Sequence, residues 1–386
     1  MAESGNAKGS ARPAAGHDPK VGAHSKGVSR VSEHKGLGAT DVLIHGAGVF
    51  GLSIGFACAR RGAKVRVVDP HGVAAGASGG IIGALAPHVP ENWNDKKAFQ
   101  LESLLMADSF WADVAAVSGL PTGYARTGRI QPLADDRAVA LAMARIDGAK
   151  ALWQGRAVWE VRAMEGLGLW PLHPPTGLLI HDTLSARINP GQACLALARG
   201  IAALGGTVTT EATSSGAANV WATGHAGLAD LSQALGAAVG RGVKGQALRL
   251  SLPGPDRAGW PQLFADGLHL VPHDDGTLAL GSTSETAFDT LNGTDARLDD
   301  LWQQARAALP FLAEARIVER WAGVRPRARS RAPMLGSWPG RNGHFIANGG
   351  FKIGFGVAPK VAEVMADLIL TGHGDIPAGF SVEANL

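Results

Sequence analysis

The sequence is poor in cysteine and lacks any apolar run long enough to cross a bilayer. Its two cysteines, Cys58 and Cys194, lie among alanines in stretches with a helical pattern, which is typical of buried structural thiols. We therefore expect no disulfide framework and no metal site, and the low cysteine content favours a reducing compartment. The N-terminus has no signal-peptide core, so we expect a cytoplasmic protein without a membrane span.

An excess of charge of one sign is also missing from most of the chain, although the pI is about 9.0. Of the 36 Lys and Arg and the 33 Asp and Glu, residues 1–40 hold six and three, so 30 of each sign remain in the rest. A neutral body offers no electrostatic footprint for a phosphate backbone, which argues against nucleic acid as a partner. Residues 1–40 lack aromatic residues and periodicity, and we expect them to form a disordered tail.

The most informative segment begins with a short apolar run, Val42–Ile44, which is typical of a buried parallel strand. Gly46, Gly48 and Gly51 follow it at the spacing of a dinucleotide-binding turn. In such a turn the first glycine permits the bend and the second lets the backbone approach a pyrophosphate. The third glycine lets the following helix pack on the strand.

The residues after this glycine triplet complete a strand–helix–strand unit. We expect an apolar helix up to Gly62, because glycine adopts the left-handed conformation that follows many helices. A second strand, Val65–Val68, ends at Asp69, where a carboxylate would accept hydrogen bonds from a ribose diol. Together these features predict binding of an adenine dinucleotide. A glycine-rich turn in an unrelated unit would leave Asp69 unexplained.

The remaining chain alternates between helical and strand patterns. Small residues dominate residues 72–90 and would let the backbone approach a flat ligand, unless this stretch is a flexible loop. Periodicity predicts helices over 95–118, 138–167, 192–204, 298–309 and 358–370. It predicts a strand pair in 123–133 and strands over 178–180, 207–210, 219–224, 243–250, 268–281 and 344–347. Asp275-Gly276 is a type I′ hairpin signal.

This order predicts an α/β protein in which a Rossmann-like domain is interleaved with a mostly antiparallel α+β substrate domain. With these motifs identified, the chain resembles the FAD-dependent D-amino-acid oxidase superfamily, which includes glycine oxidase, sarcosine oxidase and D-amino-acid dehydrogenase. The resemblance runs from Asp41 to about Leu370 and rests on six motifs. They are the glycine triplet with Asp69, residues 76–87, Lys244-Gly245-Gln246, residues 270–272 with 281–283, residues 321–326, and the turn at 349–359.

The resemblance implies a non-covalent FAD and a p-hydroxybenzoate-hydroxylase-like fold. After the tail at 1–40, FAD-binding parts would span 41–120, 183–241 and 326–386, and substrate-domain parts would span 121–182 and 242–325. The implied reaction oxidises the C–N bond of a small amine or amino acid of the glycine, sarcosine or D-amino-acid type. A hydride passes to flavin N5, the imine hydrolyses, and oxygen or another acceptor reoxidises the flavin. The family also implies a possible oligomer.

The resemblance also assigns the residues that would hold the cofactor. Backbone N–H groups at 350–354 precede a helix, whose N-terminus favours negative charge, so they could face flavin N1 and O2; an ordinary glycine turn is the alternative. The expected FAD-binding residues are Gly46, Gly48, Val49, Phe50, Gly51, Asp69, Ala77, Ser78, Gly83, Ala84, Leu85, Thr223, Gly224, Gly350, Phe351, Lys352, Ile353 and Gly354.

Two residues are expected to act on the substrate. Arg325 matches the family arginine that pairs with the substrate carboxylate, a role that suits a guanidinium because it donates two parallel hydrogen bonds. His269 stands where glycine oxidase has a tyrosine, which puts glycine itself in doubt as the substrate. His269 could still donate to a carboxylate or be an ordinary strand histidine. Lys352 could affect oxygen reactivity or be a solvated lysine.

Two other functions remain open at this point. The oxidase half of a bifunctional enzyme that modifies the tRNA wobble uridine shares the Gly-Ala-Ser segment and the Arg325 motif, although the neutral body argues against it. The other is a flavoprotein without turnover that serves as a subunit of a redox complex.

Overall fold

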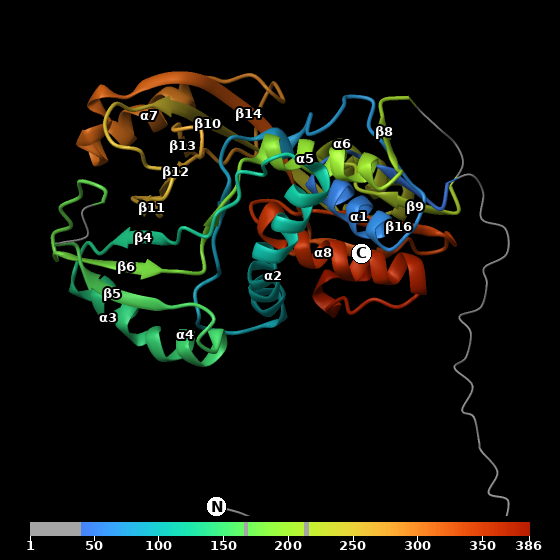
Figure 1. Cartoon of the computed structure of the whole chain (residues 1–386), viewed down its shortest axis with the longest axis horizontal. Coiled ribbons are helices and arrows are strands. Elements are labelled where there is room, and N and C mark those ends of the chain that lie inside the picture. The colour runs from blue at the N-terminus through green and yellow to red at the C-terminus, as the bar shows by residue number, and fades with distance from the viewer. Residues whose placement is uncertain (1–39, 166–168, 212–215) are drawn as a thin grey trace, which may run out of the picture. The chain divides into compact units, whose positions relative to one another are not determined.

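The computed structural model describes residues 40–165, 169–211 and 216–386. The expectation of a disordered tail concerns residues outside this part, apart from Thr40. The described residues contain a six-stranded sheet, an eight-stranded sheet and a two-stranded sheet (Figure 1). This arrangement confirms the expected α/β fold with a parallel sheet and a second, mostly antiparallel sheet. The domain boundaries stay a prediction.

The six-stranded sheet has the order β15-β16-β9-β1-β2-β8. Five strands are parallel and β15 runs antiparallel to β16. Their bounds are β1 Val42–His45, β2 Val65–Val68, β8 Thr207–Thr209, β9 Ala218–Trp221, β15 Met334–Ser337 and β16 His344–Asn348. Helices α1 (Val49–Arg60), α5 (Pro190–Ala203) and α8 (Gly354–Thr371) bury their apolar residues in one core with this sheet.

Helix α2 (Asp95–Ser118) packs against α5 and α8, as the apolar stripe of this segment predicts. Asn94 begins it, because its side chain accepts a hydrogen bond from the Lys97 N–H at 3.2 Å. Gly119, in the left-handed conformation, ends it. The expected helix end at Gly62 is confirmed in the same way, with φ +87°.

The eight-stranded sheet has the order β14-β10-β13-β12-β11-β4-β6-β5, and all neighbours are antiparallel except β11 and β4. Its strands are β4 Arg129–Pro132, β5 Trp159–Ala163, β6 Leu178–Asp182, β10 Gly240–Ser251, β11 Gln262–Ala265, β12 Leu268–Pro272, β13 Leu278–Gly281 and β14 Arg316–Ala328. Leu248, Leu270 and Leu280 pack with helix α7 (Ala296–Ala308) on one face. Because side chains alternate along a strand, Ala247, His269 and Gly281 lie on the other face.

Three local expectations are wrong. The helix expected over 138–167 breaks into α3 (Asp136–Ala144) and α4 (Ile146–Trp153), and β5 follows. Strand β5 forms because its backbone pairs with β6 and Trp159 enters the core, a tertiary contact that helical periodicity does not reveal. The expected strand pair in 123–133 supplies only β4, which pairs with β6 and β11.

The third correction concerns the hairpin between β12 and β13. The His273 N–H donates to the Thr277 carbonyl at 2.9 Å, which closes a three-residue loop of Asp274, Asp275 and Gly276. Only Gly276 of these has a positive φ, whereas a type I′ turn needs two such residues. The hairpin is therefore confirmed and its turn type is different.

Helix α6 (Gly224–Leu235) follows the expected Thr-Gly turn, and sequence periodicity did not predict it.

Cys58 and Cys194 are buried and free of disulfides, as their alanine-rich surroundings predict. Burial raises the pKa of each thiol to about 12, so neither is a reactive thiolate at neutral pH. None of the helices in the described segments is long and apolar enough to span a membrane.

Replacing Gly83 by alanine should destabilise the protein. The added Cβ would lie 1.6 Å from the carbonyl oxygen of Ile188, where the two-stranded sheet of β3 (Ala84–Leu85) and β7 (Ala186–Arg187) begins. Overpacking of this kind costs about 1–3 kcal/mol, and thermal unfolding should show a lower Tm. Gly259→Ala is the matched control, because nothing lies within 4 Å of its added Cβ. A Gly83→Ala protein with the wild-type Tm would contradict this packing.

Candidate cofactor and substrate site

The glycine triplet brings the N-terminus of α1 against the ends of three strands. Gly46 has φ +111°, and a Cβ there would lie 2.3 Å from the carbonyl oxygen of Ala222 at the end of β9. A Cβ on Gly51 would lie 2.0 Å from the Gly46 carbonyl oxygen. No other residue fits either position without a shift of the backbone. Thr223 and Gly224 follow Ala222, so they lie beside the triplet as well.

Hydrogen bonds fix Asp69 and Ser78 at this turn. The Asp69 carboxylate accepts from the Ala47 N–H at 2.9 Å and from the His71 N–H at 3.0 Å. A carboxylate offers about four lone-pair sites, so about two remain for ribose hydroxyls. The Ser78 hydroxyl accepts from the Val49 N–H at 2.9 Å. The next two N–H groups of α1 have no partner within the helix and can receive an anionic phosphate. These residues fit an adenine dinucleotide.

A second helix N-terminus lies close to the first. A Cβ on Gly350 would meet the Phe50 ring at 2.8 Å, so the turn before α8 packs on the first turn of α1. The Phe351 N–H donates to the Pro326 carbonyl at 2.9 Å, which holds this turn against β14. The N–H groups of Gly354 to Gly356 begin α8 and have no partner within it. Negative charge is therefore favoured at this point as well.

The segment from Ala77 to Leu85 runs between the two large sheets. A Cβ on Gly80 would lie 3.3 Å from the Trp321 ring on β14, and one on Gly281 would lie 3.2 Å from the Ile82 side chain. Ala77–Gly79 form a short 3-10 turn and Ala84–Leu85 form β3. The small residues in this segment therefore allow close packing against the face of the eight-stranded sheet that carries His269.

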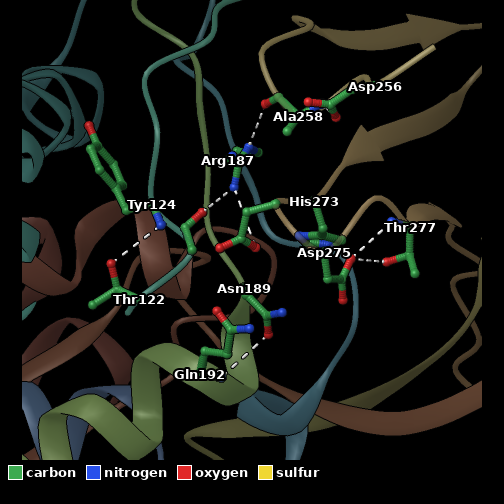
Figure 2. A network of polar contacts seen from close by, with 12 residues as sticks. Thr122, Tyr124, Arg187, Asn189, Gln192, Asp256, Ala258, His273, Asp275 and Thr277 are labelled. Carbon is green, nitrogen blue, oxygen red and sulfur yellow. Dashed lines mark hydrogen bonds and ion pairs between the residues drawn. The ribbon is translucent and has the colours of Figure 1, made fainter. Parts of the chain in front are cut away.

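A polar network that sequence reasoning missed lies around Arg187 and His273 (Figure 2). The Arg187 guanidinium donates to the Gly123 carbonyl at 2.6 Å and to the Ala258 carbonyl at 3.2 Å, and lies 3.8 Å from Asp274. Nε2 of His273 lies 2.9 Å from the Ile81 carbonyl oxygen, which only accepts, so Nε2 carries the hydrogen. Burial lowers the pKa of both side chains. No local motif distinguishes these two residues from ordinary strand and hairpin residues.

Arg325 lies on β14 opposite Val243 of β10, on the sheet face that carries His269. Its guanidinium donates to the Ser282 hydroxyl at 2.8 Å and to the Thr283 carbonyl at 3.3 Å. Burial lowers its pKa to about 10, and the charge of Glu285 opposes that shift, so the group is cationic at neutral pH. Two of its five N–H groups are thus used, and three remain for a ligand.

The Lys244-Gly245-Gln246 motif explains why Arg325 fits there. A Cβ on Gly245 would lie 2.0 Å from the nearest guanidinium nitrogen, so only glycine leaves room for that group. The buried Gln246 binds both Thr283 and Glu285. Its backbone N–H donates to the Thr283 hydroxyl at 2.8 Å, and its side-chain amide donates to Glu285 at 2.9 Å. These bonds fix the segment whose oxygen atoms hold Arg325.

His269 on β12 pairs with Gly281 of β13, and its ring lies 4.6 Å from the Phe264 ring. Burial, together with the positive charges of Arg129 and Lys352, lowers its pKa to about 4. Its Nδ1 is buried and has no partner among the described residues. The ring is therefore neutral at pH 7 and has one nitrogen available to a ligand.

The three arginines that follow Arg325 at every second position, Arg327, Arg329 and Arg331, differ in their contacts. Arg327 stacks over the Phe351 ring, with 5.3 Å between its guanidinium carbon and the ring centroid. Arg329 donates to the Leu386 carbonyl at 2.7 Å, and the Arg331 carbonyl accepts from Lys96. The Arg329 side chain is thus used by the chain itself. Burial lowers the pKa of Lys352, and the charges of Arg325 and Arg327 add to that shift, which places Lys352 near both.

A nucleotide cradle on a parallel sheet, packed against an antiparallel sheet that carries a buried arginine, defines a dinucleotide-dependent oxidoreductase. The chain belongs to the family of FAD dependent oxidoreductases, whose model matches residues 41–368. FAD is the cofactor of this family, and the resemblance to the D-amino-acid oxidase superfamily is confirmed.

Relatives support this assignment across most of the chain. Glycine oxidase from Bacillus licheniformis is 25% identical over 358 residues, which cover 86% of this chain and 93% of the relative. The structure of glycine oxidase from Geobacillus kaustophilus has a TM-score of 0.76 at 23% identity and covers 89% and 98% of the two chains. Iminodiacetate oxidase from Chelativorans sp. BNC1 has a TM-score of 0.75 at 24% identity, with 88% and 98% covered. The chain also spans 53% of a bifunctional ThiO/ThiG protein from Nostoc sp..

Asp69→Ala should weaken FAD binding, because it removes the carboxylate that is fixed beside the glycine triplet. Loss of a hydrogen bond to a charged group costs about 1.5–3 kcal/mol, which corresponds to a roughly ten- to 150-fold higher Kd. Flavin fluorescence during titration of the apoprotein measures it. Asp136→Ala, at the exposed start of α3, is the control. Equal affinity of the Asp69→Ala and wild-type proteins would remove Asp69 from the cofactor site.

Protonation of His269 should reduce stability in acid. Its folded pKa of about 4 lies below the usual 6.5, so the unfolded chain binds the proton more readily. The free energy of unfolding should then fall as the pH drops from 6.5 towards 4, by up to about 3 kcal/mol from this group. His269→Gln should show a shallower loss in urea titrations over this pH range. If the two proteins lose stability equally over this pH range, burial does not lower the pKa of His269.

Proposed function

We propose that the protein oxidises the C–N bond of a small amine that carries a carboxylate, of the glycine, sarcosine or D-amino-acid type. The observation that carries this proposal is the buried guanidinium of Arg325, which no Asp or Glu approaches within 4 Å in the described chain. A buried charge without a partner is costly, so a ligand of opposite charge is favoured there. A carboxylate suits the planar fork of the guanidinium.

His269 supplies a second polar group for the same carboxylate. Because its ring is neutral, one nitrogen donates and the other accepts, and its buried Nδ1 has no protein partner in the described segments. An N–H from His269 would take the place of the tyrosine hydroxyl of glycine oxidase. The two donors would fix the substrate carboxylate and thereby the orientation of the α-carbon.

FAD, when bound, supplies the acceptor for the hydride that leaves the α-carbon. The substrate's own nitrogen lone pair forms the C=N bond as the hydride departs, so the protein needs no strong base for a neutral amine. Water then adds to the imine, and the amine is released from the resulting carbonyl product. The electrons finally pass to oxygen or another acceptor. The N–H groups at the start of α8 stabilise negative charge that develops beside them.

The resemblance to the D-amino-acid oxidase superfamily and the names of the relatives suggest the compounds to test. Glycine, sarcosine, proline, D-amino acids and iminodiacetate should be mixed anaerobically with the FAD-loaded protein, and bleaching of the flavin absorbance recorded. We expect at least one of these amines to reduce the flavin. If none does while FAD stays tightly bound, the protein is a flavoprotein without amine turnover.

Arg325→Met should raise KM steeply for the best amine. The expected loss in kcat/KM corresponds to about 2–5 kcal/mol, because the substrate carboxylate loses its buried partner. Arg325→Lys should recover only part of this loss, since an ammonium cannot donate two parallel hydrogen bonds. Arg316→Met, at the exposed start of the same strand, is the matched control. Unchanged kinetics in Arg325→Met would exclude Arg325 as the carboxylate anchor.

A further inference from the structure

We infer that the amine substrate carries two carboxylates, one bound by Arg325 and the second bound by Lys352 with Arg327. This inference rests on the proposed function and specifies its substrate class: a primary or secondary amine that bears two carboxylates a few bonds apart.

The three cations converge from two elements. Arg325 and Arg327 are two residues apart on β14, so their side chains leave the same face of the strand. The turn that carries Lys352 is held to this strand by the bond from the Phe351 N–H to the Pro326 carbonyl, at 2.9 Å. Both cations also lie over one ring, with the Arg327 guanidinium carbon 5.3 Å and the Lys352 Nζ 5.7 Å from the Phe351 centroid.

Several other arginines of the same sheet, unlike these cations, have carboxylate partners. Arg129 pairs with Asp182 at 3.0 Å, Arg249 with Glu319 at 2.8 Å, and Arg320 with Asp299. In the segments that the structure describes, no carboxylate lies within 4 Å of Arg325, Arg327 or Lys352.

The groups around the three cations do not neutralise them. Glu285 is the acid that acts on Arg325, but its carboxylate already pairs with Arg297 at 3.1 Å and accepts from Gln246. The facing His269 is neutral, Lys96 is a further positive charge in the surroundings, and Arg129 is already paired with Asp182. Repulsion among Arg325, Arg327 and Lys352 therefore persists until anions bind.

The number of charges selects between substrate classes. A monocarboxylate would neutralise Arg325, but the positive charges of Lys352 and Arg327 would continue to repel each other. A second carboxylate on the same substrate would pair with Lys352, while Arg327 is partly compensated by the face of the Phe351 ring. Because the exposed Lys352 ammonium can form a charge-assisted hydrogen bond with a carboxylate, the dicarboxylate should bind more tightly than its neutral isostere.

Matched pairs of amines test this inference. Each pair differs only by a carboxylate and its amide: D-aspartate with D-asparagine, and iminodiacetate with its monoamide. The holoenzyme should show a kcat/KM at least tenfold higher for one dicarboxylate than for its amide partner. Lys352→Met should lose this preference, so that the two members of a pair differ by less than about twofold in kcat/KM, whereas Lys352→Arg should keep the preference. Arg306→Met, in helix α7, is the control and should change neither.

The outcomes separate this inference from the proposed function. If amines reduce the flavin but the amide partners react as well as the dicarboxylates, the second carboxylate is excluded and the proposed function stands. If Lys352→Met slows both members of each pair alike and changes the flavin reduction potential, Lys352 serves the cofactor, and the inference is wrong. If no amine reduces the flavin of the wild-type protein, the proposed function itself fails.

Discussion

The guanidinium of Arg325 occupies the space above Gly245. The other residues on the face of the eight-stranded sheet that carries His269 are arranged around this contact. The group can enter because Gly245 has no side chain, and it stays because Ser282 and Thr283 offer oxygen atoms to it. The segment that carries those oxygens is in turn fixed by the buried Gln246, whose N–H donates to the Thr283 hydroxyl. The protein therefore positions this cation with hydrogen bonds to neutral oxygen atoms, and the charge remains available to a ligand.

The cofactor side depends on the convergence of two helix N-termini. The triplet at Gly46 to Gly51 excludes side chains where α1 meets the strand ends, and Gly350 brings the start of α8 against Phe50. Both ends direct unpaired N–H groups to one region, which favours a ligand with phosphates at one end and a ring that becomes negative at the other. This pattern suits FAD and accounts for the position of small residues far apart in the sequence.

The segment between the sheets couples the two sides. It touches Trp321 and Gly281 of the eight-stranded sheet, and Ile81 within it accepts a hydrogen bond from His273 at the hairpin. Arg187 links that hairpin to the residues before β4 and to the loop after β10. The hairpin between β12 and β13 thus helps to place the backbone against which both cofactor and substrate would lie, although neither Arg187 nor His273 belongs to a recognisable motif.

The nucleotide-binding unit could be predicted from the sequence alone, because its glycine spacing and Asp69 act over a few residues in one strand–helix–strand unit. The family, the long helix α2 and the glycine turn before α8 could be predicted as well, since all of them are local patterns. Tertiary contacts were needed to bring Arg325, Arg327 and Lys352 to one face and to bury His269 so that its ring is neutral. The hydrogen bonds of Gln246, Arg187 and His273 also became visible only in the tertiary structure. These depend on strand register and burial between segments up to about two hundred residues apart, and strand β5 was missed for the same reason. Periodicity reports which face of one element is apolar, but it does not report which other element covers that face.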